Sequence, residues 1–168
     1  MPHNWQLPRW AKKPEKIELS AFGSIGSYSE PDYWISGNII HGRGATHNGM
    51  AIISWQTPFV FPSFPGADPS KYLFTQTSEW IVNYDVNLET GKGNMHYTIK
   101  ITLDDGTFEG TSNLHGTFTE PSASHHVQLV DGFRQGVFHG TGAYQGWKIV
   151  VSGPTVDGHW EPEMYLFR

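Results

Sequence analysis

The sequence predicts an all-β protein built as a single closed antiparallel β-barrel of about eight strands. Two observations support this prediction. The 168 residues include 19 glycines and 11 prolines, which are unfavourable inside helices but suit short strands and tight turns. Apolar and polar residues alternate with a period of two over several segments, as half-buried strands require. A closed barrel is favoured because it leaves no exposed edge strand.

The chain length predicts one domain. A chain of 168 residues has the usual size of a domain with a single core. We expect an irregular N-terminal arm at residues 1–16 and a β-barrel domain at residues 17–168. Within that domain, residues 57–75 form a loop rich in proline and phenylalanine, and proline cannot donate to the ladder of a central strand.

The predicted strands begin at Ile17. Residues 17–22 partly alternate apolar and polar side chains, and residues 50–55 form a further strand. Between them, a set of residues at a spacing of two is predicted to share one face of a strand: Tyr33, Ile35, Gly37, Ile39 and His41.

The clearest pattern is a hairpin. Residues 80–88 and 94–103 each place apolar side chains on one face and mostly polar side chains on the other, with a turn at residues 90–93. Such alternation is typical of antiparallel strands with one dry face. Asp104-Asp105-Gly106 predicts a tight turn. The remaining predicted strands are residues 108–118, 127–130, 133–141, 147–152 and 164–167.

Composition excludes several classes of function. The net charge of −5 argues against nucleic-acid binding, which needs clustered basic residues. The absence of cysteine excludes disulfides and thiolate chemistry, and it fits a reducing compartment. Neither a signal-peptide pattern nor an apolar run of about 20 residues, the length of a membrane span, is present. We therefore expect a soluble cytoplasmic protein.

Two glycine-rich segments resemble each other and a known superfamily. Gly136–Gly146 (GVFHGTGAYQG) resembles a hairpin of the allene oxide cyclase-like and dirigent-like barrels, and Asp105–Gly110 is similar to their strand–turn–strand sequence. The resemblance implies a calycin-like barrel with an apolar cavity, often in an oligomer, that holds hydrophobic small molecules or guides their cyclisation without a cofactor. Gly106–Thr111 also echoes Gly136–Thr141, which we interpret as two equivalent hairpins.

Aromatic residues on the predicted dry faces are the best candidates for a binding site. Ligand sites are mostly apolar with a few polar groups that fix orientation, and tyrosine and tryptophan supply both. In the catalytic version of this hypothesis, Tyr84, Tyr97 and His139 position or transfer protons. The ligand-binding residues are Trp55, Trp80 and His41. The alternative is a barrel interior filled by its own side chains.

The sequence does not predict a metal site, a cofactor or a serine nucleophile. The nine histidines show no His-x-His spacing, so neither a metal site nor a cofactor is predicted. Glu79, Asp85 and Glu109 fall on polar faces and are expected to be solvated. A serine nucleophile is not expected, because the Gly-x-Ser-x-Gly motif is missing.

Three functions follow from this pattern. The leading hypothesis is binding of a small hydrophobic molecule in an aromatic-lined cavity, with cofactor-free isomerisation or cyclisation as its enzymatic form. The second is a non-catalytic assembly module that forms a homo-oligomer through the 57–75 loop. The third is a carbohydrate-binding domain in which exposed aromatic rings stack on sugars.

Overall fold

The protein is all-β, as predicted. The computed structural model describes residues 17–54, 72–74, 77–160 and 163–167, and it describes side chains for residues 27–49, 77–160 and 163–167. The described residues contain no α-helix, and no helix among them is long and apolar enough to cross a membrane. The elements are β1 (Ile17–Tyr28), β2 (Asp32–Ser36), β3 (Ile39–Ser54), β4 (Tyr72–Phe74), β5 (Thr77–Asn87), β6 (Lys92–Leu103), β7 (Gly106–Phe118), β8 (Leu129–Gly140), the 3₁₀ turn η2 (Gly142–Tyr144), β9 (Lys148–Val156), β10 (His159–Trp160) and β11 (Glu163–Phe167).

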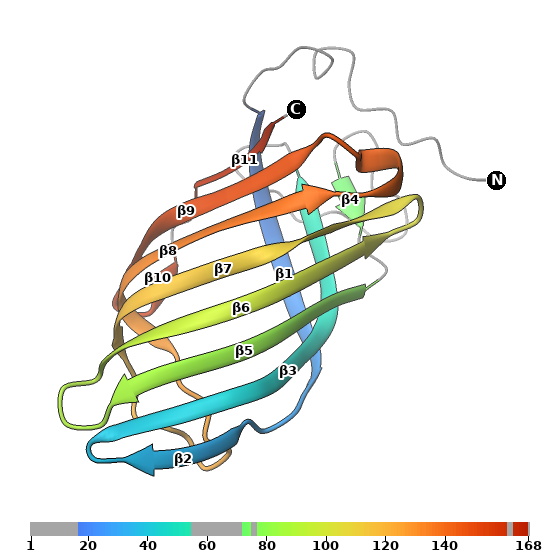
Figure 1. Ribbon diagram of the computed structural model, residues 1–168. Helices are drawn as coiled ribbons and strands as arrows, with labels where there is room; N and C mark the ends of the chain where they lie inside the picture. The colour runs from blue at the N-terminus through green and yellow to red at the C-terminus, as the bar shows by residue number, and fades with distance from the viewer. Residues whose placement is uncertain (1–16, 55–71, 75–76, 161–162, 168) are drawn as a thin grey trace.

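All eleven strands belong to one curled sheet, but the prediction of a closed calycin-like barrel is wrong. The strand order runs β1-β11-β9-β8-β7-β6-β5-β3-β2, with β10 paired to β9 and β4 paired to β3. Every ladder is antiparallel (Figure 1). The order ends at β2, which pairs only with β3 among the described strands. The sheet is therefore open.

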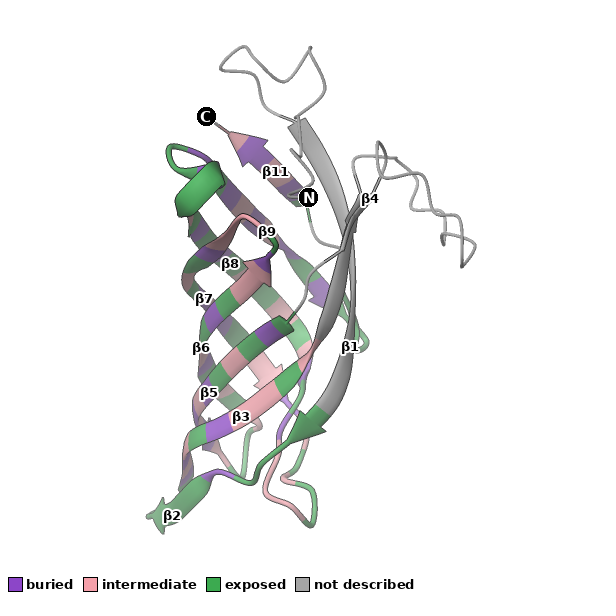
Figure 2. Cartoon of the chain, turned by 90° about the vertical axis from the view of Figure 1, so that its right-hand side faces the viewer, coloured by how far each residue is buried: buried purple, intermediate pink, exposed green. Residues whose placement is uncertain are grey.

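The pairing of strand β1 shows why the curled sheet is not a closed barrel. Residues 17–19 of β1 pair with β11, whereas residues from Ser20 to Tyr28 pair with β3. In the described ladders, no residue of β1 has partners on both sides. The β1–β11 ladder ends after three pairs, at Leu19 and Met164, whereas closure needs a hydrogen-bonded neighbour on each side of every strand. Figure 2 shows the strands from β5 to β9 side by side, with buried and exposed residues alternating along them.

The predicted central hairpin is confirmed. Trp80 of β5 pairs with Ile99 of β6, and Tyr84 pairs with Met95. Val82, Tyr84 and Val86 are buried, while the residues between them are exposed or half-buried. The predicted tight turn is confirmed as well, because β6 ends at Leu103 and β7 begins at Gly106.

The two glycine-rich segments turned out to be partners in one ladder rather than two equivalent hairpins. Phe108 of β7 lies opposite Gly140 of β8, and Phe138 of β8 lies opposite Gly110 of β7. Both phenylalanines are buried. A Cβ on Gly110 would lie 1.9 Å from the Val137 carbonyl oxygen, so the strand backbones approach too closely there for any other residue. The echo reflects a local two-fold arrangement of the two strands.

Buried side chains form two apolar clusters on the inner face of the sheet. The first cluster contains Ile99, Leu103, Phe108, Phe138, Tyr144, Trp147, Ile149, Val151, Met164 and Leu166. The second contains Ile40, Ala45, Val82, Tyr84, Val86, Met95, Leu114, Phe118, Val127 and Leu129. Tyr97 packs against both. Between the clusters, β7 contributes Ser112 and β8 contributes Arg134. We call Tyr97, Ser112 and Arg134 the inner polar band.

Some predicted segments lie outside the described residues. They include the arm at residues 1–16 and residues 57–71 of the Pro/Phe-rich loop. The end of that predicted loop is a short strand, β4, which pairs with residues 52–54 of β3. The oligomer contact expected from the loop therefore stays a prediction.

Candidate functional site

The predicted catalytic residues do not converge. Tyr84 and Tyr97 point to the inner face, where Tyr84 is buried and Tyr97 is half-buried. His139 is exposed on the outer face of β8, beside the exposed Phe133 and Val137. These three residues share one face of β8, and that face is the exposed one. His139 therefore cannot exchange protons with a ligand held by the two tyrosines.

Tyr84 is a core residue rather than part of an open site. Its ring packs under Gly42, where a Cβ would lie 2.2 Å from the Tyr84 Cε1 atom. Its hydroxyl donates to the backbone carbonyl of His125, which lies in the loop between β7 and β8. Burial raises the pKa of the Tyr84 hydroxyl. The partner that a buried hydroxyl requires is thus supplied by the protein itself.

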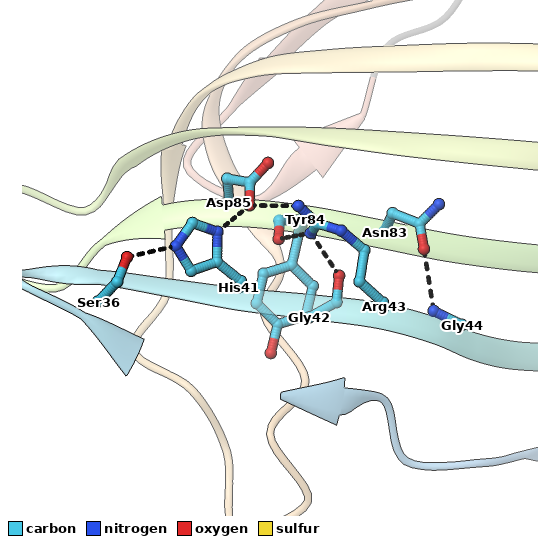
Figure 3. Close-up of polar contacts among 8 residues, drawn as sticks. All are labelled: Ser36, His41, Gly42, Arg43, Gly44, Asn83, Tyr84 and Asp85. Atoms are coloured by element: carbon cyan, nitrogen blue, oxygen red, sulfur yellow. Dashed lines mark hydrogen bonds and ion pairs between the residues drawn. The ribbon is translucent and has the colours of Figure 1, made fainter. Parts of the chain in front are cut away.

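His41 belongs to a polar cluster on the outer face, which we call the outer cluster: Ser36, His41, Arg43 and Asp85. His41 Nε2 lies 2.8 Å from Ser36 Oγ, and His41 Nδ1 lies 2.5 Å from Asp85 Oδ1 (Figure 3). Arg43 Nη2 donates to the same Asp85 oxygen at 2.7 Å. The ring of Trp34 stacks on His41, with centroids 4.9 Å apart and planes at 16°.

Strand register explains why these residues meet. His41 lies directly opposite Asp85 in the β3–β5 ladder and opposite Trp34 in the β2–β3 ladder. The predicted continuous strand face from Tyr33 to His41 is wrong, because the chain turns at Gly37, which has a φ of +58°, and Asn38. This turn folds Ser36 back towards His41.

A β-bulge sets the position of Arg43. The β3–β5 register shifts between Gly42 and Ala45, and both of these residues are buried although they are three positions apart. One residue is therefore inserted, as in a bulge, and Gly44 adopts a φ of +70°. Arg43 Nη1 then donates to the carbonyls of Gly42 and Tyr84 at 2.8 and 2.7 Å.

Asp85 is held as a carboxylate. Burial acts to raise its pKa, but hydrogen bonds and charge from Arg43 and His41 outweigh burial and lower it. An ionised carboxylate only accepts hydrogen bonds, so His41 Nδ1 carries the proton. In the neutral ring, Nε2 then presents its lone pair to the Ser36 hydroxyl.

The inner polar band centres on Arg134. Its Nε donates to Ser112 Oγ at 2.9 Å, and its guanidinium carbon lies 5.3 Å from the Tyr97 ring centroid and 4.4 Å from that of Trp160. Ser112 is fully buried and donates to the Gln135 carbonyl at 3.1 Å. The predicted ligand-binding residue Trp80 is adjacent, since its ring meets Tyr97 edge-on at 5.9 Å. Trp55 lies outside the described residues.

Among the described residues, no carboxylate forms an ion pair with Arg134. Burial lowers the pKa of Arg134 and raises that of Tyr97. Within the described part of the chain, the ion pairs join His41 and Arg43 to Asp85 and Lys100 to Glu109, and none includes Arg134. A half-buried cation without a counter-charge is costly unless other groups stabilise it.

A third group of polar side chains lies where the β7–β8 loop meets β1 and β3. The rings of His47 and His126 lie 5.5 Å apart, and Tyr28 contacts both. Burial, and then the charge of His126, lower the pKa of His47. No three acidic or histidine side chains converge as metal ligands anywhere in the described residues.

Sequence reasoning missed the key members of both clusters. Glu79 and Asp85 were both expected to be solvated. Glu79 is exposed, but Asp85 is the acceptor shared by His41 and Arg43. Glu109 is exposed as expected and accepts from Thr107 Oγ1 at 2.8 Å. Arg134 could have been found from the alternation along β8. It lies on the same strand face as the buried Gly136 and Phe138, so a charged residue occupies a position of the dry face.

Comparison of the chain with protein-family models, curated proteins and solved structures finds no match. The resemblance to allene oxide cyclase-like proteins therefore stays a prediction.

Proposed function

We propose that the protein binds a small amphipathic molecule on the inner face of its curled sheet. The ligand has an apolar body and one carboxylate, and the carboxylate pairs with Arg134. This proposal keeps the small apolar ligand predicted from the sequence and adds an anionic group to it. It does not involve His139, which faces the opposite side of the sheet.

The observation that carries the proposal is the environment of Arg134. Its guanidinium is flanked by two aromatic rings, lies between two apolar clusters, and has no carboxylate partner among the described residues. Aromatic rings and a hydroxyl stabilise the cation only in part. A ligand carboxylate would complete the charge balance, because arginine binds carboxylates through two parallel hydrogen bonds.

The surroundings of Arg134 also fit the apolar part of such a ligand. Trp80 and Tyr97 present ring surface next to the first apolar cluster. Trp160 is 38% exposed, so a ligand can reach the guanidinium from the side of β10. Because Trp160 lies next to Arg134, a carboxylate that binds there should change the tryptophan fluorescence of the protein.

The test compares decanoate with decanol by tryptophan fluorescence and isothermal titration calorimetry. The two probes share an apolar chain and differ in charge. We expect decanoate to bind more tightly, and Arg134→Met to weaken decanoate binding by about 10–100-fold, as for loss of a charged hydrogen bond. Arg43→Met is the matched control, because Arg43 also lies over a tryptophan ring but on the outer face, and it should bind decanoate normally.

Two outcomes would overturn this function. If neither probe binds, the inner face is filled by its own side chains. If both probes bind equally, or if Arg134→Met binds decanoate as the unmodified protein does, Arg134 is not the anion site.

A further inference from the structure

The outer cluster contains a serine, a histidine and an aspartate in one hydrogen-bonded chain. Ser36 Oγ, His41 Nε2, His41 Nδ1 and Asp85 Oδ1 follow one another at 2.8 Å and 2.5 Å across the ring (Figure 3). Catalytic triads show this order of atoms and this tautomer, and they are recognised by geometry and not by sequence spacing. The cluster lies on the opposite face of the sheet from Arg134 and is independent of ligand binding there.

Two neighbours fix the histidine ring, Asp85 at its edge and Trp34 on its face. Asp85 accepts from Nδ1 and is itself held by Arg43, whose other terminal nitrogen is anchored to two backbone carbonyls. The Trp34 ring covers one face of the imidazole. Such support keeps Nε2 pointing at Ser36, which a general base needs in order to remove a proton from a hydroxyl.

The exposure of Ser36 to solvent limits the class of substrate that can react with it. All five residues of β2 are exposed, including Ser36, whereas the side chain of His41 is only 19% exposed. An acyl donor therefore reaches the hydroxyl from solvent without entering the sheet. Because Ser36 lies on an exposed hairpin, the substrate must bring its own good leaving group, as an aryl ester does.

We propose that Ser36 is a nucleophile that accepts an acyl group from an activated ester, with His41 as its general base. Ser36 Oγ forms a bond to the acyl carbon while His41 Nε2 takes the hydroxyl proton. The ester C–O bond breaks, and the leaving alcohol receives that proton. Water then attacks the acyl carbon and gives a proton to His41, the bond between Ser36 Oγ and the acyl carbon breaks, and Oγ receives that proton from His41 as the free acid leaves. Asp85 is a positioning residue that holds the ring.

The experiment follows the reaction of the full chain with p-nitrophenyl acetate. We expect release of p-nitrophenol and, after a short reaction time and acid quench, one acetyl group on the peptide that contains Ser36. Ser36→Ala and His41→Ala should each lower the rate by about 100-fold, the usual contribution of a general base. Asp85→Asn should lower kcat while KM stays unchanged, which a purely structural role would not produce.

Controls separate this mechanism from unspecific acetylation and from misfolding. Ser29→Ala is the matched variant, because Ser29 is also exposed and its hydroxyl contacts Thr46 instead of a histidine; it should keep the full rate. Near-ultraviolet circular dichroism checks that each variant is folded. The proposal fails if folded Ser36→Ala reacts at the full rate, or if the acetyl group is found on lysines and not on Ser36.

Discussion

The inner polar band and the outer cluster lie on opposite faces of the same sheet, and they differ in how charge is balanced. In the outer cluster, one carboxylate accepts from both His41 and Arg43. In the inner band, Arg134 has a hydroxyl and two rings as partners. The charges of the outer cluster are therefore balanced within the cluster, whereas no carboxylate among the described residues pairs with Arg134, which is why we propose that a ligand anion does so. Our proposal of a ligand site on the inner face therefore rests on the charge of Arg134 and not on the number of polar groups around it.

The largest expected effect is on stability, and it comes from Gly42, whose missing side chain would point to the inner face of β3. It lies between His41 and Arg43 on the outer side, while the Tyr84 ring fills the space beneath it. Gly42→Ala should lower the free energy of unfolding by about 3 kcal/mol, because the added methyl group overlaps a ring that is fixed by its own hydrogen bond. Urea denaturation measures this loss.

Gly44→Ala provides the matched comparison. A Cβ at Gly44 meets nothing within 4 Å, but the residue has a φ of +70°, so the cost is backbone strain of about 1 kcal/mol. Equal losses in the two variants would contradict the close packing of Tyr84 against β3.

Arg134→Met and Asp85→Asn should change stability in opposite directions. Methionine removes an unbalanced charge from the inner face, and such replacements are often neutral or stabilising. Asparagine leaves Arg43 and His41 without their carboxylate, which should cost about 1 kcal/mol at this partly exposed site. Thermal unfolding without ligand measures both. Clear destabilisation by Arg134→Met would mean that Arg134 is structural, and the contrast between the two clusters would disappear.

The smallest effect is a pH dependence. Burial disfavours the cationic form of His47, as it does for Arg134, so the pKa of His47 is below its ordinary value of 6.5. The unfolded chain therefore binds more protons at this residue, and stability should fall as the pH drops below about 6.5. His47→Phe keeps a ring beside Tyr28 and His126 and should flatten this part of the pH profile. If the stability of His47→Phe depends on pH as that of the unmodified protein does, other titratable groups cause the pH dependence.

The sequence was sufficient to predict the elements that rest on local patterns. The β5–β6 hairpin was predicted with the correct faces, because alternation and turn residues determine both. The β2–β3 hairpin was missed, since Gly37 preserves the alternation of the residues around it. His139 was predicted to act beside Tyr84 and Tyr97 but lies on the exposed face of β8, because alternation alone does not say which face of a strand is buried.

Long-range features were not predictable in this way. Whether the sheet closes depends on how many residues β1 pairs with β11, and alternation contains no information on that number. The Ser36–His41–Asp85 contact joins the β2–β3 hairpin to a residue on β5, far along the chain. In the sequence, Asp85 falls on a polar strand face, as solvated residues do, and His41 alternates in step with apolar residues, so no local pattern indicates that the two side chains meet.

The divided pairing of β1 has a consequence for how the chain folds during synthesis. Residues from Ser20 to Tyr28 can pair with β3 early, because that partner follows closely in the sequence. Ile17, however, pairs with Leu166, so its partner is translated long after it. Contacts of such high sequence separation form slowly. The beginning of the first strand therefore has no native partner until nearly every other strand has been made, and during that interval its unpaired backbone groups are open to pairing with another chain.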